Sequence, residues 1–223
     1  CLGIKKIANL KIKKLPEFEW LNSFEIVCLN LDPVLIGVDA TDDRNYEYRW
    51  YKDGTLLNEG DEGRILIKEG GKYEVLASTT TGTLCSKSIS IELFSSEIAS
   101  VSQNDLSVTD LEGDTGAVKI NTNNLGVGDY EFAIDDSLGI FKDFPYFDNL
   151  LPGIHNIYIR DKNDCGMVQI ESSILGHMKF FSPNGDGIND YWNVLGVSEN
   201  FQPKTKVYIY DRRGKLLKDL NPL

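Results

Sequence analysis

Short alternating segments separated by turn residues are the feature that most limits what this chain can fold into. Tyr46, Tyr48 and Trp50 lie two positions apart, so their side chains point to one face of a strand. The turn sequence Lys-Asp-Gly follows at 52–54. Residues 128–136 alternate in the same way and also end in a turn. We therefore expect an all-β fold.

Cysteine spacing suggests how the strands are grouped. Cys1, Cys85 and Cys165 each precede an alternating segment and lie about 80 residues apart, the length of a small β-sandwich module. The sequence has no initiator methionine and no signal peptide, so we expect a fragment of a longer protein. We predict four parts: the tail of an upstream module (1–14), an immunoglobulin-like module (15–94), a second β-sandwich (95–175) and a smaller third domain (176–223).

Charge is spread unevenly over these parts. The net charge is −11, and residues 96–174 carry 4 basic and 14 acidic side chains, whereas residues 175–223 carry 7 and 5. An acidic surface repels phosphate backbones, so we expect no nucleic-acid partner. No apolar run reaches the roughly 18 residues that a membrane helix requires.

Reactive groups are sparse. The sequence has no nucleophile elbow, no zinc-protease sequence, no phosphate loop and no dinucleotide fingerprint. It has no Cys-x-x-Cys pair, and its two histidines, His155 and His177, are far apart. We therefore predict that this chain is not an enzyme and has no cofactor, with calcium as the single possibility.

The sequence FFSPNGDGIND at residues 180–190 carries the most specific signal. Oxygen-bearing side chains alternate with glycines, which permit the positive φ angles of a tight loop. The loop could be held by its own Asx turns. Alternatively, it could bind calcium through side chains of Asn184, Asp186 and Asp190 and the carbonyl of Ile188, although calcium prefers six to eight oxygens.

Aromatic side chains flank this loop, and two roles are open for them. Phe180, Phe181 and Trp192 could form the core of a small sandwich with strands at 194–196 and 207–210. They could instead anchor in a pocket of a partner protein, since aromatic residues often dominate interfaces.

The loop, followed by an alternating strand at 206–210 and a turn at 211–215, resembles the gliding-motility-associated C-terminal domain. This is the type B sorting domain of cargo for the bacterial type IX secretion system. The resemblance runs from about residue 175 to 223 and implies a β-sandwich, truncated here because family members continue into a further segment and a final strand. It also implies that the secretion machinery recognises seven residues: Phe180, Phe181, Pro183, Asn184, Asp186, Asp190 and Trp192.

The two preceding modules resemble the immunoglobulin-like and polycystic-kidney-disease-type modules of large gliding adhesins. We expect Cys28 and Cys85 to pair and to staple the first and last parts of the first module. Two states are open for Cys165: a free thiol, or a disulfide with a cysteine outside its own module.

These resemblances imply a secreted or cell-surface protein, associated with the outer membrane of a Gram-negative bacterium. The implied partners are the type IX translocon, a porin-like outer-membrane barrel, and an unknown surface or glycan. The expected function is surface attachment or gliding. The alternative is that these modules and the sorting domain belong to an exported hydrolase whose catalytic domain lies upstream.

Overall fold

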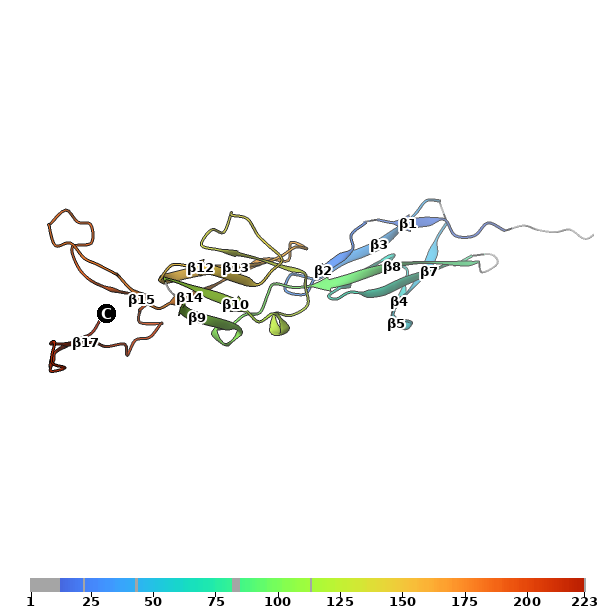
Figure 1. Cartoon of the computed structure of the whole chain (residues 1–223). Helices are drawn as coiled ribbons and strands as arrows, with labels where there is room; N and C mark the ends of the chain where they lie inside the picture. The colour runs from blue at the N-terminus through green and yellow to red at the C-terminus, as the bar shows by residue number, and fades with distance from the viewer. Residues whose placement is uncertain (1–12, 22, 43, 82–84, 113, 223) are drawn as a thin grey trace, which may run out of the picture. The chain divides into compact units, whose positions relative to one another are not determined.

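The computed structural model describes residues 13–21, 23–42, 44–81, 85–112 and 114–222, and these residues form mainly short strands (Figure 1). They divide into two compact units, Cys1–Ser96 and Glu97–Leu223. The predicted all-β fold is confirmed. The predicted upstream tail at 1–14, with Cys1, lies almost wholly outside the described residues. No helix within these ranges has the length and apolar character to cross a membrane.

The first unit is a sandwich of two sheets. One sheet has the order β1–β3–β6 and the other the order β2–β8–β7–β4–β5. Neighbouring strands are antiparallel except β2 and β8, which run parallel. The strands are β1 (Phe18–Trp20), β2 (Ile26–Cys28), β3 (Val34–Ala40), β4 (Tyr46–Lys52), β5 (Thr55–Gly60), β6 (Arg64–Ile67), β7 (Gly71–Thr79) and β8 (Ser86–Ser96).

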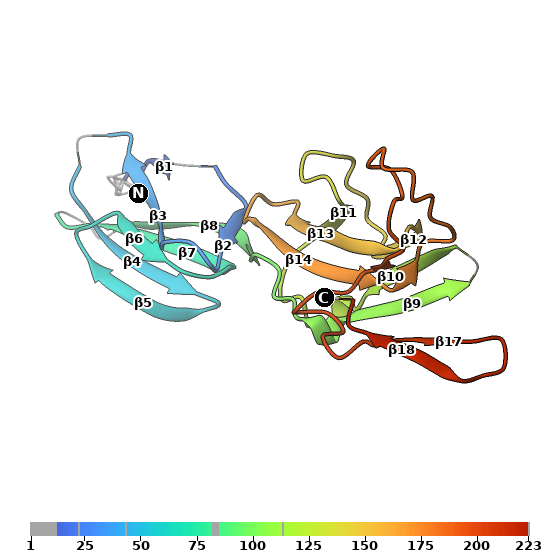
Figure 2. The ribbon, with the colours of Figure 1, turned by 90° about the vertical axis from the view of Figure 1, so that its left-hand side faces the viewer.

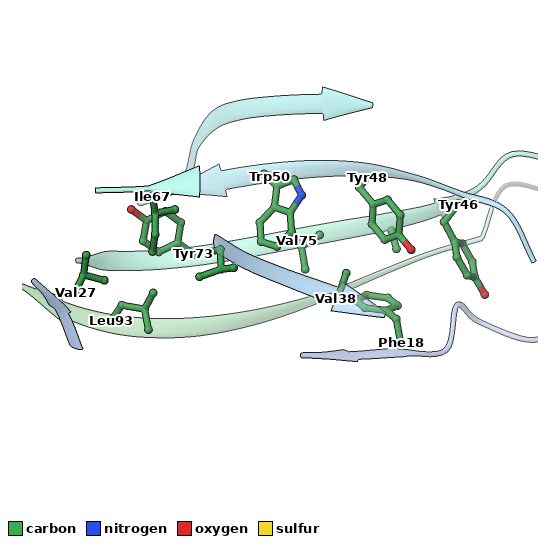
Figure 3. Close-up of a cluster of buried hydrophobic side chains, with 12 residues drawn as sticks. Phe18, Val27, Val38, Tyr46, Tyr48, Trp50, Ile67, Tyr73, Val75 and Leu93 are labelled. Carbon is green, nitrogen blue, oxygen red and sulfur yellow. The ribbon is translucent and has the colours of Figure 1, made fainter. Parts of the chain in front are cut away.

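The core of the first unit lies between these sheets. Figure 3 shows Trp50 of β4 beside Val75 of β7, and both side chains are fully buried. Tyr46 and Tyr48 are buried on the same face of β4, because side chains two residues apart share a face of a strand. The alternation predicted for β4 is confirmed.

The second unit contains a sandwich of its own. One sheet has the order β12–β10–β9 and the other the order β11–β13–β14. Its core joins Val118 and Phe147 of the first sheet to Phe132, Ile157 and Ile174 of the second. The elements are η1 (Gln103–Asp105), β9 (Leu106–Glu112), β10 (Thr115–Ile120), η2 (Thr122–Asn124), β11 (Tyr130–Ile134), β12 (Tyr146–Leu150), β13 (Gly153–Asp161) and β14 (Met167–Ile174).

Two strand pairs follow the second sandwich. β15 (Gly176–His177) pairs with β16 (Val194–Leu195), and β17 (Val207–Tyr210) pairs with β18 (Leu216–Leu220) as the red hairpin in Figure 2. The strands predicted around residues 194 and 207 are confirmed. All four belong to the second compact unit, and the predicted domain boundary after residue 175 stays a prediction.

The predicted disulfide between Cys28 and Cys85 is wrong. Cys28 is disulfide-bonded, as is Cys165 of the second unit, whereas Cys85 has a free thiol. The parallel register pairs Cys28 with Ser96, the last residue of the 11-residue strand β8. Cys85 precedes the first residue of β8, so the two cysteines lie at opposite ends of this strand. At about 3.3 Å per residue the two cysteines lie about 35 Å apart, far beyond the roughly 7 Å limit for bridged Cα atoms.

Candidate functional site

The loop between β15 and β16 is held together by the carboxylate of Asp190. This carboxylate accepts hydrogen bonds from the backbone N–H groups of Asn184 (3.0 Å), Gly185 (2.7 Å) and Gly187 (2.8 Å). The N–H donors of Gly185 and Gly187 favour the charged form and lower the pKa of Asp190, against a smaller opposing effect of burial. One side chain therefore closes the loop on itself.

A second carboxylate, that of Asp186, holds the centre of the loop. It accepts from the backbone N–H of Ile188 (2.7 Å) and from the side-chain amide of Asn184 (2.8 Å), and these bonds lower its pKa. Gly185 and Gly187 have φ angles of 79° and 83°, which glycine adopts without strain. The pattern is that of the Asx-turn interpretation.

The four possible calcium ligands do lie together in this loop. However, the carboxylate oxygens of Asp186 and Asp190 already accept backbone N–H groups, with which a cation would compete. Within the described ranges, no group of three or more His, Cys, Asp and Glu side chains could hold a metal ion. Calcium binding by Asn184, Asp186, Ile188 and Asp190 stays a prediction.

The aromatic residues that precede the loop lie on the surface. Phe180 and Phe181 are 68% and 54% exposed, and Pro183 is exposed as well. The core alternative is therefore wrong for Phe180 and Phe181, because a core side chain has to be removed from water. Their exposure agrees with the alternative, a role in contacting a partner.

Trp192, after the loop, is exposed at 40%, yet its side chain is held in place. Its indole N–H donates to the carbonyl oxygen of Met178 at 2.7 Å, and its ring centroid lies 6.0 Å from that of His177. Trp192 thus connects the two ends of the loop at the strand pair β15–β16.

Gly196, at the end of β16, attaches this segment to the second sandwich. The Ser173 hydroxyl of β14 donates to the Gly196 carbonyl oxygen. Gly196 has a φ of 79°, and a Cβ at this position would lie 2.3 Å from the carbonyl oxygen of Ile174. Gly196 was not predicted from the sequence, although an isolated glycine beside a strand signals a close backbone approach.

An open groove of about 390 Å³ lies beside Trp192 and was not predicted. Its lining is mostly apolar and comes from β15, β16, β17 and the segment before β17. The lining residues are Leu175, Gly176, His177, Trp192, Val194, Thr205, Lys206 and Val207.

Comparison with known families identifies this segment. Residues 175–219 match the CHU_C type IX secretion signal domain. The match begins just before β15, spans the loop and groove, and confirms the predicted sorting domain. It implies that this chain is exported by type IX secretion and is secreted or displayed at the cell surface. A secretion signal and β-sandwiches of this kind are features of a non-catalytic region.

Several solved structures are similar to the chain that bears this secretion signal. A two-domain fibronectin type III segment of chicken tenascin has 12% identity and a TM-score of 0.34, over 72% of this chain and 99% of its own. A chimeric titin Z1Z2 tandem has 20% identity and a TM-score of 0.29, over 71% and 97%.

The β-glucuronidase of Parabacteroides merdae has 15% identity and a TM-score of 0.27, over 72% of this chain and 24% of the enzyme. This chain therefore spans about a quarter of the enzyme's length. Such low scores carry no inference about activity. No curated protein matches the chain.

Proposed function

We propose that this chain belongs to a cell-surface adhesin that the type IX system exports and that acts in surface attachment or gliding. The observation that supports the proposal most is the match of residues 175–219 to a type IX secretion signal domain. The two β-sandwiches would act as display modules, and the adhesive ligand would be a surface or a glycan.

The secretion machinery would recognise the signal through its loop. Hydrogen bonds to Asp186 and Asp190 fix the loop's backbone, and Phe180 and Phe181 project from its base into solvent. A fixed loop loses little conformational entropy on binding, and exposed aromatic side chains can bury a large apolar area in a partner pocket. The proposed partners are the type IX translocon during export and a porin-like outer-membrane barrel afterwards.

Export of the full chain fused to a reporter tests the recognition step. Phe180 and Ile188 form a matched pair, because both are apolar and they are 68% and 67% exposed in the same segment. Phe180→Ala combined with Phe181→Ala should reduce the amount of reporter on the cell surface, whereas Ile188→Ala should leave it unchanged. Equal export of all three proteins would contradict recognition through the aromatic pair.

The hydrolase alternative uses the same secretion signal, so an export experiment cannot distinguish it from the adhesin. An attachment experiment can distinguish them. Purified chain should compete with cells for the surface to which they adhere if its modules bind that surface. An absence of competition, together with a glycoside- or peptide-cleaving activity of the full-length gene product, would favour the hydrolase.

A further inference from the structure

The loop between β11 and β12 presents two aliphatic side chains directly to solvent. Leu138 and Ile140 are each 94% exposed, so the described part of their own chain leaves them uncovered. Contiguous exposed apolar patches mark interaction sites. We call these two residues the apolar tip.

The apolar tip sits on a loop whose backbone is fixed. Phe132 and Lys142 exchange backbone hydrogen bonds of 2.8 Å and 2.9 Å at its base. The Asp136 carboxylate accepts from the N–H of Leu138 at 2.9 Å, and the Arg160 guanidinium lies 4.0 Å from the centroid of the Phe141 ring. A loop fixed in this way pays little entropy on binding.

Acidic side chains outnumber basic ones in the segment that carries the apolar tip, although Lys142 follows the tip and Arg160 lies against Phe141. Asp135 and Asp136 precede the tip and are exposed, and the whole segment 96–174 carries 14 acidic and 4 basic side chains. A surface that accepts this tip should therefore be apolar at its centre and basic at its rim.

The groove of the secretion signal has those properties. Trp192, Val194 and Val207 give it an apolar lining, and its volume of about 390 Å³ is within the range of about 300–1,000 Å³ for binding clefts. Lys206 lines the groove and Lys204 lies two residues away, and both are exposed. Tip and groove are thus complementary in polarity and in charge, yet the tip of one chain is not covered by its own groove.

We propose that the apolar tip of one copy docks in the groove of a second copy, so that displayed chains associate head to tail. The contact uses two different surfaces, so each added copy leaves one tip and one groove free, and association can continue beyond a dimer. Two aliphatic side chains in one groove make a small interface, which is typical of weak contacts. Dense display on a cell surface would strengthen such contacts through effective concentration.

Analytical ultracentrifugation of the purified full chain tests this proposal without any secretion machinery, so its result is independent of the export experiment. Every protein carries Cys85→Ser, which prevents covalent dimers. Between about 10 μM and about 1 mM the average mass should rise with concentration. Leu138→Asp combined with Ile140→Asp should weaken association at least about tenfold, because it would place charge in the apolar groove.

A double-mutant cycle tests the charged contact. Asp136→Asn keeps an oxygen for the N–H of Leu138 but removes the charge, and Lys206→Glu reverses the charge at the groove. Each substitution should weaken association severalfold. Lys206→Glu should weaken association less in the Asp136→Asn background than in the original chain.

Leu66→Asp, which alters an exposed leucine of the first unit, serves as the control and should leave association unchanged. Three results would overturn the proposal: a monomer at all concentrations, equal weakening by Leu66→Asp, or additive effects of Asp136→Asn and Lys206→Glu. Unchanged circular dichroism and melting would show that the tip variants fold.

Discussion

Attachment of the secretion signal to the second sandwich depends on Gly196. Replacing Gly196 with alanine adds a Cβ that would lie 2.3 Å from the carbonyl oxygen and 2.8 Å from the carbonyl carbon of Ile174. Both are backbone atoms, so relief requires β16 to move away from the end of β14. A left-handed φ costs a residue with a Cβ about 1–2 kcal/mol, and overpacking adds about 1–3 kcal/mol. We therefore expect Gly196→Ala to lower the free energy of opening the β15–β16 pair by about 3 kcal/mol.

Gly185 provides a matched control. It has the same φ of 79°, but a Cβ there would meet no atom within 4 Å. Gly185→Ala should therefore introduce only the strain of a left-handed φ, which lowers stability by about 1–2 kcal/mol. This loss should be confined to the loop.

Hydrogen exchange of the full chain, followed by mass spectrometry, measures the two effects. The opening free energy of the β15–β16 pair should fall by about 3 kcal/mol in Gly196→Ala, while amides of β13 keep their protection. In Gly185→Ala the β15–β16 pair should keep its protection. Equal exchange of this pair in the two variants would refute the argument that Gly196 permits a close approach of two backbones.

Other features of the molecule can be tested with simple measurements. Thiol labelling without reduction should modify Cys85 and leave Cys28 and Cys165 unmodified, and a labelled Cys28 would contradict the bonding described. Because backbone donors lower the pKa of Asp186 and Asp190, their stabilisation of the loop is complete above the ordinary pKa of 3.8 and is lost as the pH falls through the lowered pKa. Loop amide shifts in an NMR titration should thus stay in place down to pH 3.8, and a transition near pH 5 would contradict this. Excess calcium should leave the same shifts unchanged, since backbone N–H groups already bind both carboxylates; a saturable calcium-dependent change would instead favour the metal-site interpretation.

Local pattern was enough to predict several strands and the tight loop, and the resemblance of the last residues to a known family predicted the secretion signal. Alternation at Tyr46, Tyr48 and Trp50 predicts a half-buried strand because the side-chain period of a strand is two. The sequence of residues 180–190 predicts a tight loop because its Asx and glycine residues supply both the acceptors and the positive φ angles. Neither feature depends on how distant parts of the chain pair.

Features that depend on non-local pairing were missed. The disulfide prediction failed because β2 runs parallel to β8, which places Cys28 opposite Ser96 at the far end from Cys85. Phe180 and Phe181 have the composition of core residues, and only the course of the chain around them shows that they are exposed. The close approach at Gly196 likewise depends on β14, which precedes it by more than twenty residues.

Export of this chain is expected to depend on residues 175–219, which match a type IX secretion signal domain. The most direct test is to express the reporter-tagged chain behind a signal peptide for transport to the periplasm, with and without these residues, in cells that have or lack the type IX translocon. We expect reporter on the surface or outside the cell only when the segment and the translocon are both present, and reporter in the periplasm in the other three combinations. Normal export of the chain without residues 175–219 would contradict this expectation.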